Sequence, residues 1–205
     1  MKIMKMLTAL ALFCFALLSY AERLMPMEFI GQPLMLLEKG NPQSCGIRIV
    51  GIQTPLNFNN PNEVLFAPDG SFMFDKKGYG LVKALAYQIT VKDVTSDKAA
   101  KDIPFKSFWF KADNFKATTP IIKPYKGEQK YSLLYATEAD SVIGLYNAVL
   151  NNEVIKFALK FENASQDVAY YGKVSIKKDE LQQVVSCMDE LTAQMSKEID
   201  QQTVK

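Results

Sequence analysis

The sequence predicts an α+β, β-rich protein: an antiparallel curved sheet or sandwich of about eight strands, with one short helix and a long C-terminal amphipathic helix packed on it. Alternation of side chains, clearest over residues 81–91, is the first observation behind this prediction. The second is a change to helical spacing after Thr137 and again from Asp179. The third is the clusters of Gly, Pro and Asn between the apolar runs, which are typical of turns.

Short apolar runs separated by turn residues predict the strands of the first half. The tripeptide Pro68-Asp69-Gly70 stands between two such runs, and its turn chemistry predicts a β-hairpin. Residues 92–102 are polar and predict a surface loop or a short helix. The strands predicted in this half cover residues 34–37, 45–52, 64–66, 72–74 and 81–91.

The second half predicts further strands and two helices. The stretch Thr137-Glu138-Ala139-Asp140 resembles a capping box, and apolar residues follow it at helical spacing as far as residue 150. Residues 179–200 predict a long helix whose apolar stripe packs against the sheet. The strands predicted here cover residues 105–111, 131–135, 154–161 and 168–176, with an edge or loop at 118–126.

The N-terminus has the layout of a secretory signal peptide. Two lysines precede an apolar stretch over residues 6–18, and Ser19 and Ala21 match a small-x-small cleavage site. A membrane anchor would need about 20 apolar residues, which is more than this stretch provides. We therefore predict that residues 1–21 are removed as a signal peptide, that residues 22–205 form a single globular domain, and that the protein is exported to the periplasm or the extracellular space.

Composition excludes several classes of function. The chain of 205 residues contains no His, which excludes Ser-His-Asp triads, Cys-His pairs and His-containing zinc sites. Loss of Lys2 and Lys5 with the signal peptide leaves 22 basic and 22 acidic residues, and a neutral chain lacks the positive charge that nucleic acid binding requires. We expect no nucleic acid partner, no cofactor, no metal site and no membrane span after cleavage.

Two cysteines, Cys45 and Cys187, remain in the predicted mature chain. Exported proteins fold in an oxidising environment, and the chain has no C-x-x-C motif that would indicate a redox site. We predict that these cysteines form a structural disulfide, which would clamp the C-terminal helix to an early strand.

Two patterns that could suggest catalysis both have structural explanations. The stretch Ser175-Ile176-Lys177-Lys178 matches S-x-x-K, but the partner motifs S-D-N and K-T-G are missing. Neighbouring acids such as Asp179-Glu180 fall where the N-termini of helices favour negative charge. We therefore assign no catalytic residue, although two acids that are distant in the sequence could still converge in the fold.

Residues 104–126 form the most unusual segment. They contain five Lys, one acid and six aromatic residues, including the only Trp of the chain, Trp109. Strand parity places Trp109 opposite Phe108 and Phe110, so burial of the two Phe would leave the Trp facing outward or into a cleft. The alternative is that the acidic C-terminal helix covers this face. The candidate binding residues are Lys106, Trp109, Lys111, Lys116 and Tyr125.

We expect an exported, non-enzymatic binding protein, such as an inhibitor, an immunity protein or an adaptor, that contacts another protein through this surface. The second hypothesis is a carrier that holds a small apolar or anionic ligand in a cavity of the β-structure. A carboxylate-dependent hydrolase is the third. A flat surface around Trp109 would favour the first hypothesis, a deep pocket lined by Phe and Tyr the second, and convergent acids in a cleft the third.

Overall fold

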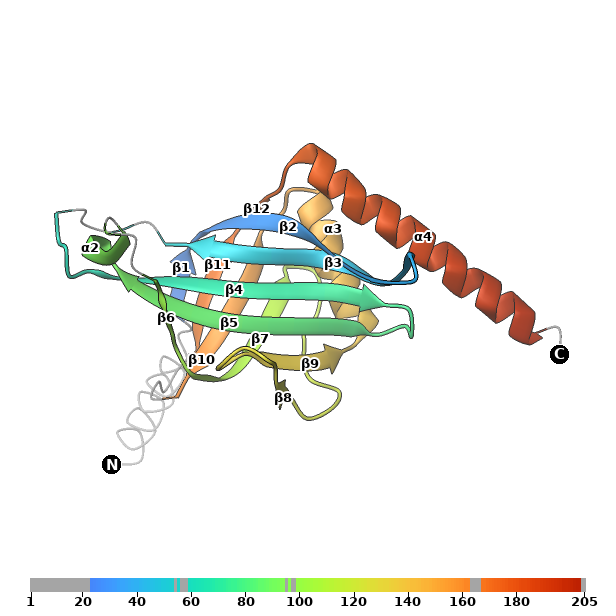
Figure 1. Cartoon of the computed structure of the whole chain (residues 1–205), viewed down its shortest axis with the longest axis horizontal. Helices are drawn as coiled ribbons and strands as arrows, with labels where there is room; N and C mark the ends of the chain where they lie inside the picture. Colours follow the sequence, from blue (N-terminus) through green and yellow to red (C-terminus); the bar gives the residue numbers. More distant parts are fainter. Residues whose placement is uncertain are drawn as a thin grey trace, which may run out of the picture.

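Twelve strands and three helices make up the described part of the chain in the computed structural model (Figure 1). The structure describes residues 23–53, 55, 59–94, 96, 99–162 and 167–203. The predicted signal peptide lies outside these residues. Four of the twelve strands have four residues or fewer, which leaves eight longer strands in two sheets. The predicted fold class, a mostly antiparallel β-structure with a long C-terminal helix, is confirmed.

The larger sheet has eight strands, and its centre is a run of sequential antiparallel neighbours, β2 to β5. Strand β9 continues the sheet beyond β5, and three short strands, β6, β8 and β12, complete it. The bounds are β2 (Glu28–Glu38), β3 (Asn41–Ile52), β4 (Val64–Asp75), β5 (Gly80–Thr90), β6 (Lys101–Asp102), β8 (Tyr125–Lys126), β9 (Leu133–Thr137) and β12 (Val174–Ser175).

The smaller sheet has the strand order β1-β11-β10-β7, so β7 is an edge strand. In Figure 1 it lies behind the larger sheet, and its strands run steeply across those in front. Strands β10 and β11 pair antiparallel. The bounds are β1 (Arg23–Pro26), β7 (Phe105–Ala112), β10 (Ile155–Phe161) and β11 (Val168–Gly172).

The two sheets are joined along one side, where two parallel strand pairs bend together from one sheet into the other. The chain leaves β1 and enters β2 at Met27, and it leaves β11 and enters β12 at Lys173. The Met27 amide donates to the Tyr171 carbonyl at 3.0 Å, and the Phe29 amide donates to the Lys173 carbonyl at 3.4 Å. These bonds continue the pairing through the bend.

Aromatic rings fill the space between the sheets. Phe110 of β7 packs on Phe72 of β4 with ring centroids 6.0 Å apart, and Phe108 packs on Tyr135 of β9 at 4.7 Å. Strand β5 makes room for these rings because the side chains on its inner face are small: Val82, Ala84 and Ala86 are all buried. Its larger apolar side chains lie on the outer face of the sheet.

The helices differ in where they pack. Helix α2 (Val91–Val94) is a single turn that follows β5 directly. Helix α3 (Ala139–Leu150) buries Val142, Leu145, Ala148 and Val149 in the core, against β4, β5 and β7. Helix α4 (Lys178–Thr203) packs on β2 and β3, and its C-terminal half extends past the sheets (Figure 1).

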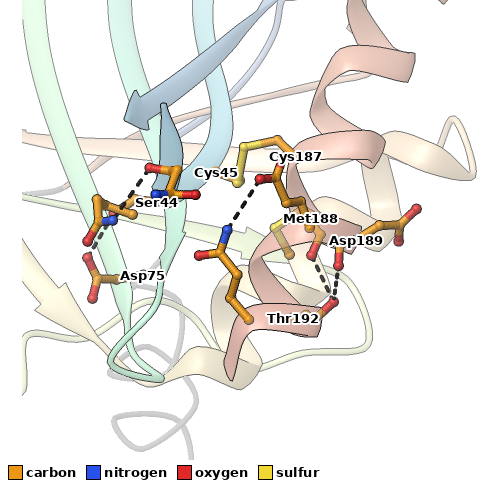
Figure 2. The surroundings of a disulfide bond; sticks show 11 residues. Ser44, Cys45, Asp75, Cys187, Met188, Asp189 and Thr192 are labelled. Carbon is orange, nitrogen blue, oxygen red and sulfur yellow. Dashed lines mark hydrogen bonds between the residues drawn. A yellow bond between two sulfur atoms is a disulfide. The ribbon is translucent and has the colours of Figure 1, made fainter. Parts of the chain in front are cut away.

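A disulfide between Cys45 of β3 and Cys187 of α4 confirms the predicted pairing, with Cα atoms 5.9 Å apart. Figure 2 shows that it joins the strand to the middle of the helix, next to the Ser44–Asp75 hydrogen bond. Val184 and Leu191, one turn on either side of Cys187, are fully buried. The apolar stripe therefore packs on the sheet, as predicted, and the acidic helix covers β2 and β3 rather than β7.

The hairpin predicted at Pro68-Asp69-Gly70 is wrong, because β4 runs straight through these residues. The position of each residue in the sheet accounts for its presence in a strand. Asp69 binds Arg48 of β3, and an added Cβ at Gly70 would meet the Phe110 ring, so no larger residue fits there. Pro68 lies one residue beyond the last β4 position that pairs with β3.

The capping box predicted at Thr137 is also wrong. Helix α3 begins after Glu138, whose side chain makes no capping hydrogen bond. Thr137 is the last residue of β9, is fully buried, and its hydroxyl accepts the Thr119 amide at 3.1 Å. The Thr137 hydroxyl, which the local pattern predicts to cap the helix, therefore accepts a tertiary hydrogen bond from Thr119 instead.

Candidate functional site

Trp109 lies on the outer face of the four-stranded sheet, on its edge strand β7. Along β7, Phe108 and Phe110 are buried and Trp109 is half-buried on the opposite face, as strand parity predicts. Its cross-strand neighbours are Ala158 of β10 and then Ala169 of β11. Both alanines are small and fully buried, so this row of the sheet leaves space for a large ring beside them.

A hydrogen bond fixes the orientation of the indole. Trp109 Nε1 donates to Asp167 Oδ2 at 3.1 Å, and Asp167 Oδ1 lies 3.9 Å from Lys160 Nζ. Asp167 immediately precedes β11, so the bond spans three adjacent strands. Because the ring is already ordered, a partner that contacts it would lose less side-chain entropy on binding.

Lysines surround the indole on this face. Lys111 is paired with Lys156 of β10, and Lys156 with Tyr171 of β11. Lys106 is the extra residue of a β-bulge, where the register shifts between Lys160 and the next residue of β10. Asp113 and Asp167 are the two acids bonded to these lysines, so four Lys and two Asp give this face a net charge of +2. We call it the Trp109 face.

Exposed apolar side chains adjoin the lysines. Leu24 of β1 lies in the same cross-strand row as Trp109 and is 49% exposed, and Tyr171 is 37% exposed. Aromatic and aliphatic side chains beside a polar, solvent-accessible rim are typical of protein contact surfaces.

The free edge of β7 is closed by hydrogen bonds within the chain. The Phe110 amide donates to Thr118 Oγ1 at 2.9 Å, and the Thr118 amide donates to the Phe110 carbonyl at 2.8 Å. The Phe108 carbonyl accepts the Tyr135 hydroxyl at 3.0 Å, and burial raises the pKa of Tyr135 to about 12. Because these backbone groups are occupied, the β7 edge does not offer them to an added strand at Phe108 and Phe110.

The structure separates the other two candidate residues from the Trp109 face. Lys116 lies in the exposed segment that follows β7, and the neighbouring Phe115 packs on Gly144 of α3. Tyr125 is 48% exposed but belongs to β8, in the eight-stranded sheet. Of the predicted set, Trp109, Lys106 and Lys111 therefore share a strand.

Sequence reasoning missed the residues that neighbouring strands contribute to this face. Lys156, Lys160, Asp167, Tyr171 and Leu24 reach it through the registers of β10, β11 and β1. The positions of Lys156 and Lys160 on one face of β10, opposite Phe157 and Leu159, were a signal that this face reaches solvent. It could not identify β7 as the neighbouring strand.

Aromatic rings fill the interior around Phe110. Phe110 and Phe157 stack at 4.3 Å between centroids, and Phe72 and Tyr135 contact the same cluster. The rings that could have lined a deep pocket instead pack on one another.

Three further findings concern metal sites, membrane-spanning helices and similarity to known proteins. The described residues contain no group of three or more Cys, Asp or Glu side chains placed to hold a metal ion. Within the same residues, none of the helices has the length and apolar character to span a bilayer. Comparison of the chain with protein-family models, with curated proteins and with solved structures gives no match.

Proposed function

We propose that this protein is exported and acts by binding another protein through the Trp109 face. The observation that carries the proposal is the indole of Trp109, which is half-buried on the outside of a sheet and held in place by Asp167. Tryptophan is enriched among the residues that dominate binding energy at interfaces. A binding partner that contacts Trp109 would explain why an ordered, half-buried indole lies among lysines on an outer face.

Charge complementarity suggests the chemistry of the partner. The Trp109 face carries four Lys against two Asp, and the ion pairs of Lys156 and Lys160 are partly exposed. Exposed pairs of this kind contribute little to stability, so the lysines can be re-paired without much loss. We propose a partner with exposed carboxylates around an apolar side chain that contacts Trp109.

Export rests on two separate observations. The first 21 residues have the layout of a signal peptide. The Cys45–Cys187 disulfide favours an oxidising compartment, such as the periplasm or the cell exterior. Mass determination of the protein recovered from the export compartment should give a chain that begins at Glu22, and recovery of the intact 205-residue chain would contradict the proposal.

A capture experiment with matched variants tests the binding proposal. The immobilised mature protein, its Trp109→Ala variant and a Tyr125→Ala control would be compared by quantitative mass spectrometry on extract from the source cell's export compartment. Tyr125 is a suitable control because it is an exposed aromatic on the other sheet. The captured partner would then be purified and titrated against all three forms.

We expect Trp109→Ala to weaken the purified partner's affinity by about 30-fold, equivalent to about 2 kcal/mol, and Tyr125→Ala to leave it unchanged. Lys111→Glu should weaken it as well, and the affinity should fall with added salt. Because Trp109 is half-buried and loses one hydrogen bond, its replacement should cost about 2 kcal/mol of stability, which a domain of this size can tolerate. Equal affinity for the wild type and Trp109→Ala would refute the proposal.

A further inference from the structure

A polar pocket on the outer face of the eight-stranded sheet is independent of the Trp109 face. Its volume is about 220 Å³, smaller than the roughly 300–1,000 Å³ of pockets for drug-sized ligands. Three of its side chains, Arg48, Ser71 and Lys83, form one cross-strand row over β3, β4 and β5. Directly opposed residues share a face of the sheet, so three hydrogen-bond donors line one side of the pocket.

Arg48 is held in a fixed orientation within this pocket. Its Nε donates to Asp69 Oδ1 at 3.0 Å and its Nη2 to Asp69 Oδ2 at 2.6 Å. The side chain of Asp69 is only 6% exposed, whereas that of Arg48 is 47% exposed. The carboxylate thus fixes one edge of the guanidinium plane, and the edge with Nη1 remains available to a ligand.

Lys83 brings a second positive charge that no carboxylate neutralises. Its Nζ donates to the neutral amide oxygen of Gln129 at 2.6 Å, and none of the acids in the described residues lies within ion-pair distance of it. With Arg48 balanced by Asp69, the pocket carries a net charge of +1. Leu34 and Leu85 form apolar walls beside these polar groups.

We propose that this pocket binds a small organic monoanion, a short-chain carboxylate whose charged end lies between Arg48 and Lys83 and whose alkyl chain lies against Leu34 and Leu85. A single negative charge matches the net charge of the pocket. The apolar walls favour a carboxylate with a hydrocarbon chain over a free phosphate, which would leave those walls without a partner and bring excess charge. Ser71 supplies a further hydroxyl donor to a carboxylate oxygen.

Calorimetric titration of the mature protein with butyrate, hexanoate and inorganic phosphate tests this proposal, with butanol as the uncharged analogue. We expect a dissociation constant of about 1 mM for the two carboxylates, which ligands of this size can reach. Lys83→Met should weaken carboxylate binding by about tenfold or more, because a charge-assisted hydrogen bond is lost. Lys77→Met, which removes an exposed lysine from the turn after β4, is the matched control and should change the affinity less than about twofold.

Three outcomes would overturn the proposal. The first is the absence of heat from all three anions while the protein remains folded, which would make Arg48–Asp69 a purely structural ion pair. The second is equal carboxylate affinity in the wild type and Lys83→Met. The third is tighter binding of phosphate than of hexanoate, which would assign the pocket to an inorganic anion. None of these results depends on whether Trp109 contacts a partner.

Discussion

Removal of the disulfide should destabilise the whole protein and not only the helix that it anchors. Cys45 and Cys187 are separated by 142 residues, so the bond closes about three quarters of the predicted mature chain into one loop. Both cysteines are buried, at 1% and 6% exposure, and both contact the main core. Replacement by alanine keeps the Cβ atoms and removes the covalent link.

The magnitude follows from the loop length. The chain-entropy relation, applied to a separation of 142 residues, gives about 5 kcal/mol of stabilisation at 25 °C. Measured losses for native disulfides in small exported domains span about 2–5 kcal/mol. We therefore expect Cys45→Ala/Cys187→Ala to lower the free energy of unfolding by about 3–5 kcal/mol, most of it through the greater entropy of the unfolded chain.

Urea unfolding with two probes provides the assay. Fluorescence of Trp109, the only tryptophan, follows the four-stranded sheet, and far-ultraviolet circular dichroism follows the helices. The oxidised wild type is the reference, and both probes should move together to a lower midpoint in the double variant. A loss below about 1 kcal/mol, or a variant in which only the helical signal shifts, would show that the bond merely docks α4 and would refute the loop-entropy argument.

Two further predictions concern the core and the corner between the sheets. Burial raises the pKa of Tyr135 to about 12, above the value of about 10 expected in the unfolded chain, so the stability that Tyr135 contributes should be complete below pH 10 and lost as the pH rises toward 12. Urea midpoints measured over this range should fall more in the wild type than in Tyr135→Phe, and parallel curves would contradict the assignment. Gly172→Ala should cost about 3 kcal/mol, because the new Cβ would collide with the Met27 carbonyl where the strand pairs bend, while Gly40→Ala, with φ of +84° but open space around it, should cost about 1 kcal/mol. Equal losses from the two glycine variants, measured by urea unfolding, would show that the corner can relax.

Several elements could be predicted because their signals are local. The alternation over residues 81–91 corresponds to β5, and the helical stripe from Asp179 corresponds to α4. The Cys45–Cys187 pairing followed from the two cysteines that remain after removal of the predicted signal peptide, and strand parity separated Trp109 from its buried neighbours. Each of these inferences depends either on residues within one element or, for the disulfide, on the one pairing that two cysteines allow.

The predictions that failed were those in which a local pattern competed with a distant partner. Pro68-Asp69-Gly70 has turn chemistry, but Arg48, which is 21 residues from Asp69, engages the carboxylate and β4 continues. Thr137 has capping chemistry, but the Thr119 amide takes its hydroxyl. The contacts that decided both cases are absent from any short window of sequence.

The sequence by itself determined the periodicity of the main strands and helices, the disulfide and the side of β7 on which Trp109 lies. Tertiary structure alone decided which strands are neighbours, and with them the composition of both candidate surfaces. Lys156 and Asp167 meet Trp109 through the registers of β10 and β11, and the Arg48–Lys83 row exists only because β3, β4 and β5 align. Adjacent strands lie about 4.8 Å apart in space while their residues can be dozens of positions apart in the chain, so the charge and shape of a sheet face depend on a register that local patterns do not specify.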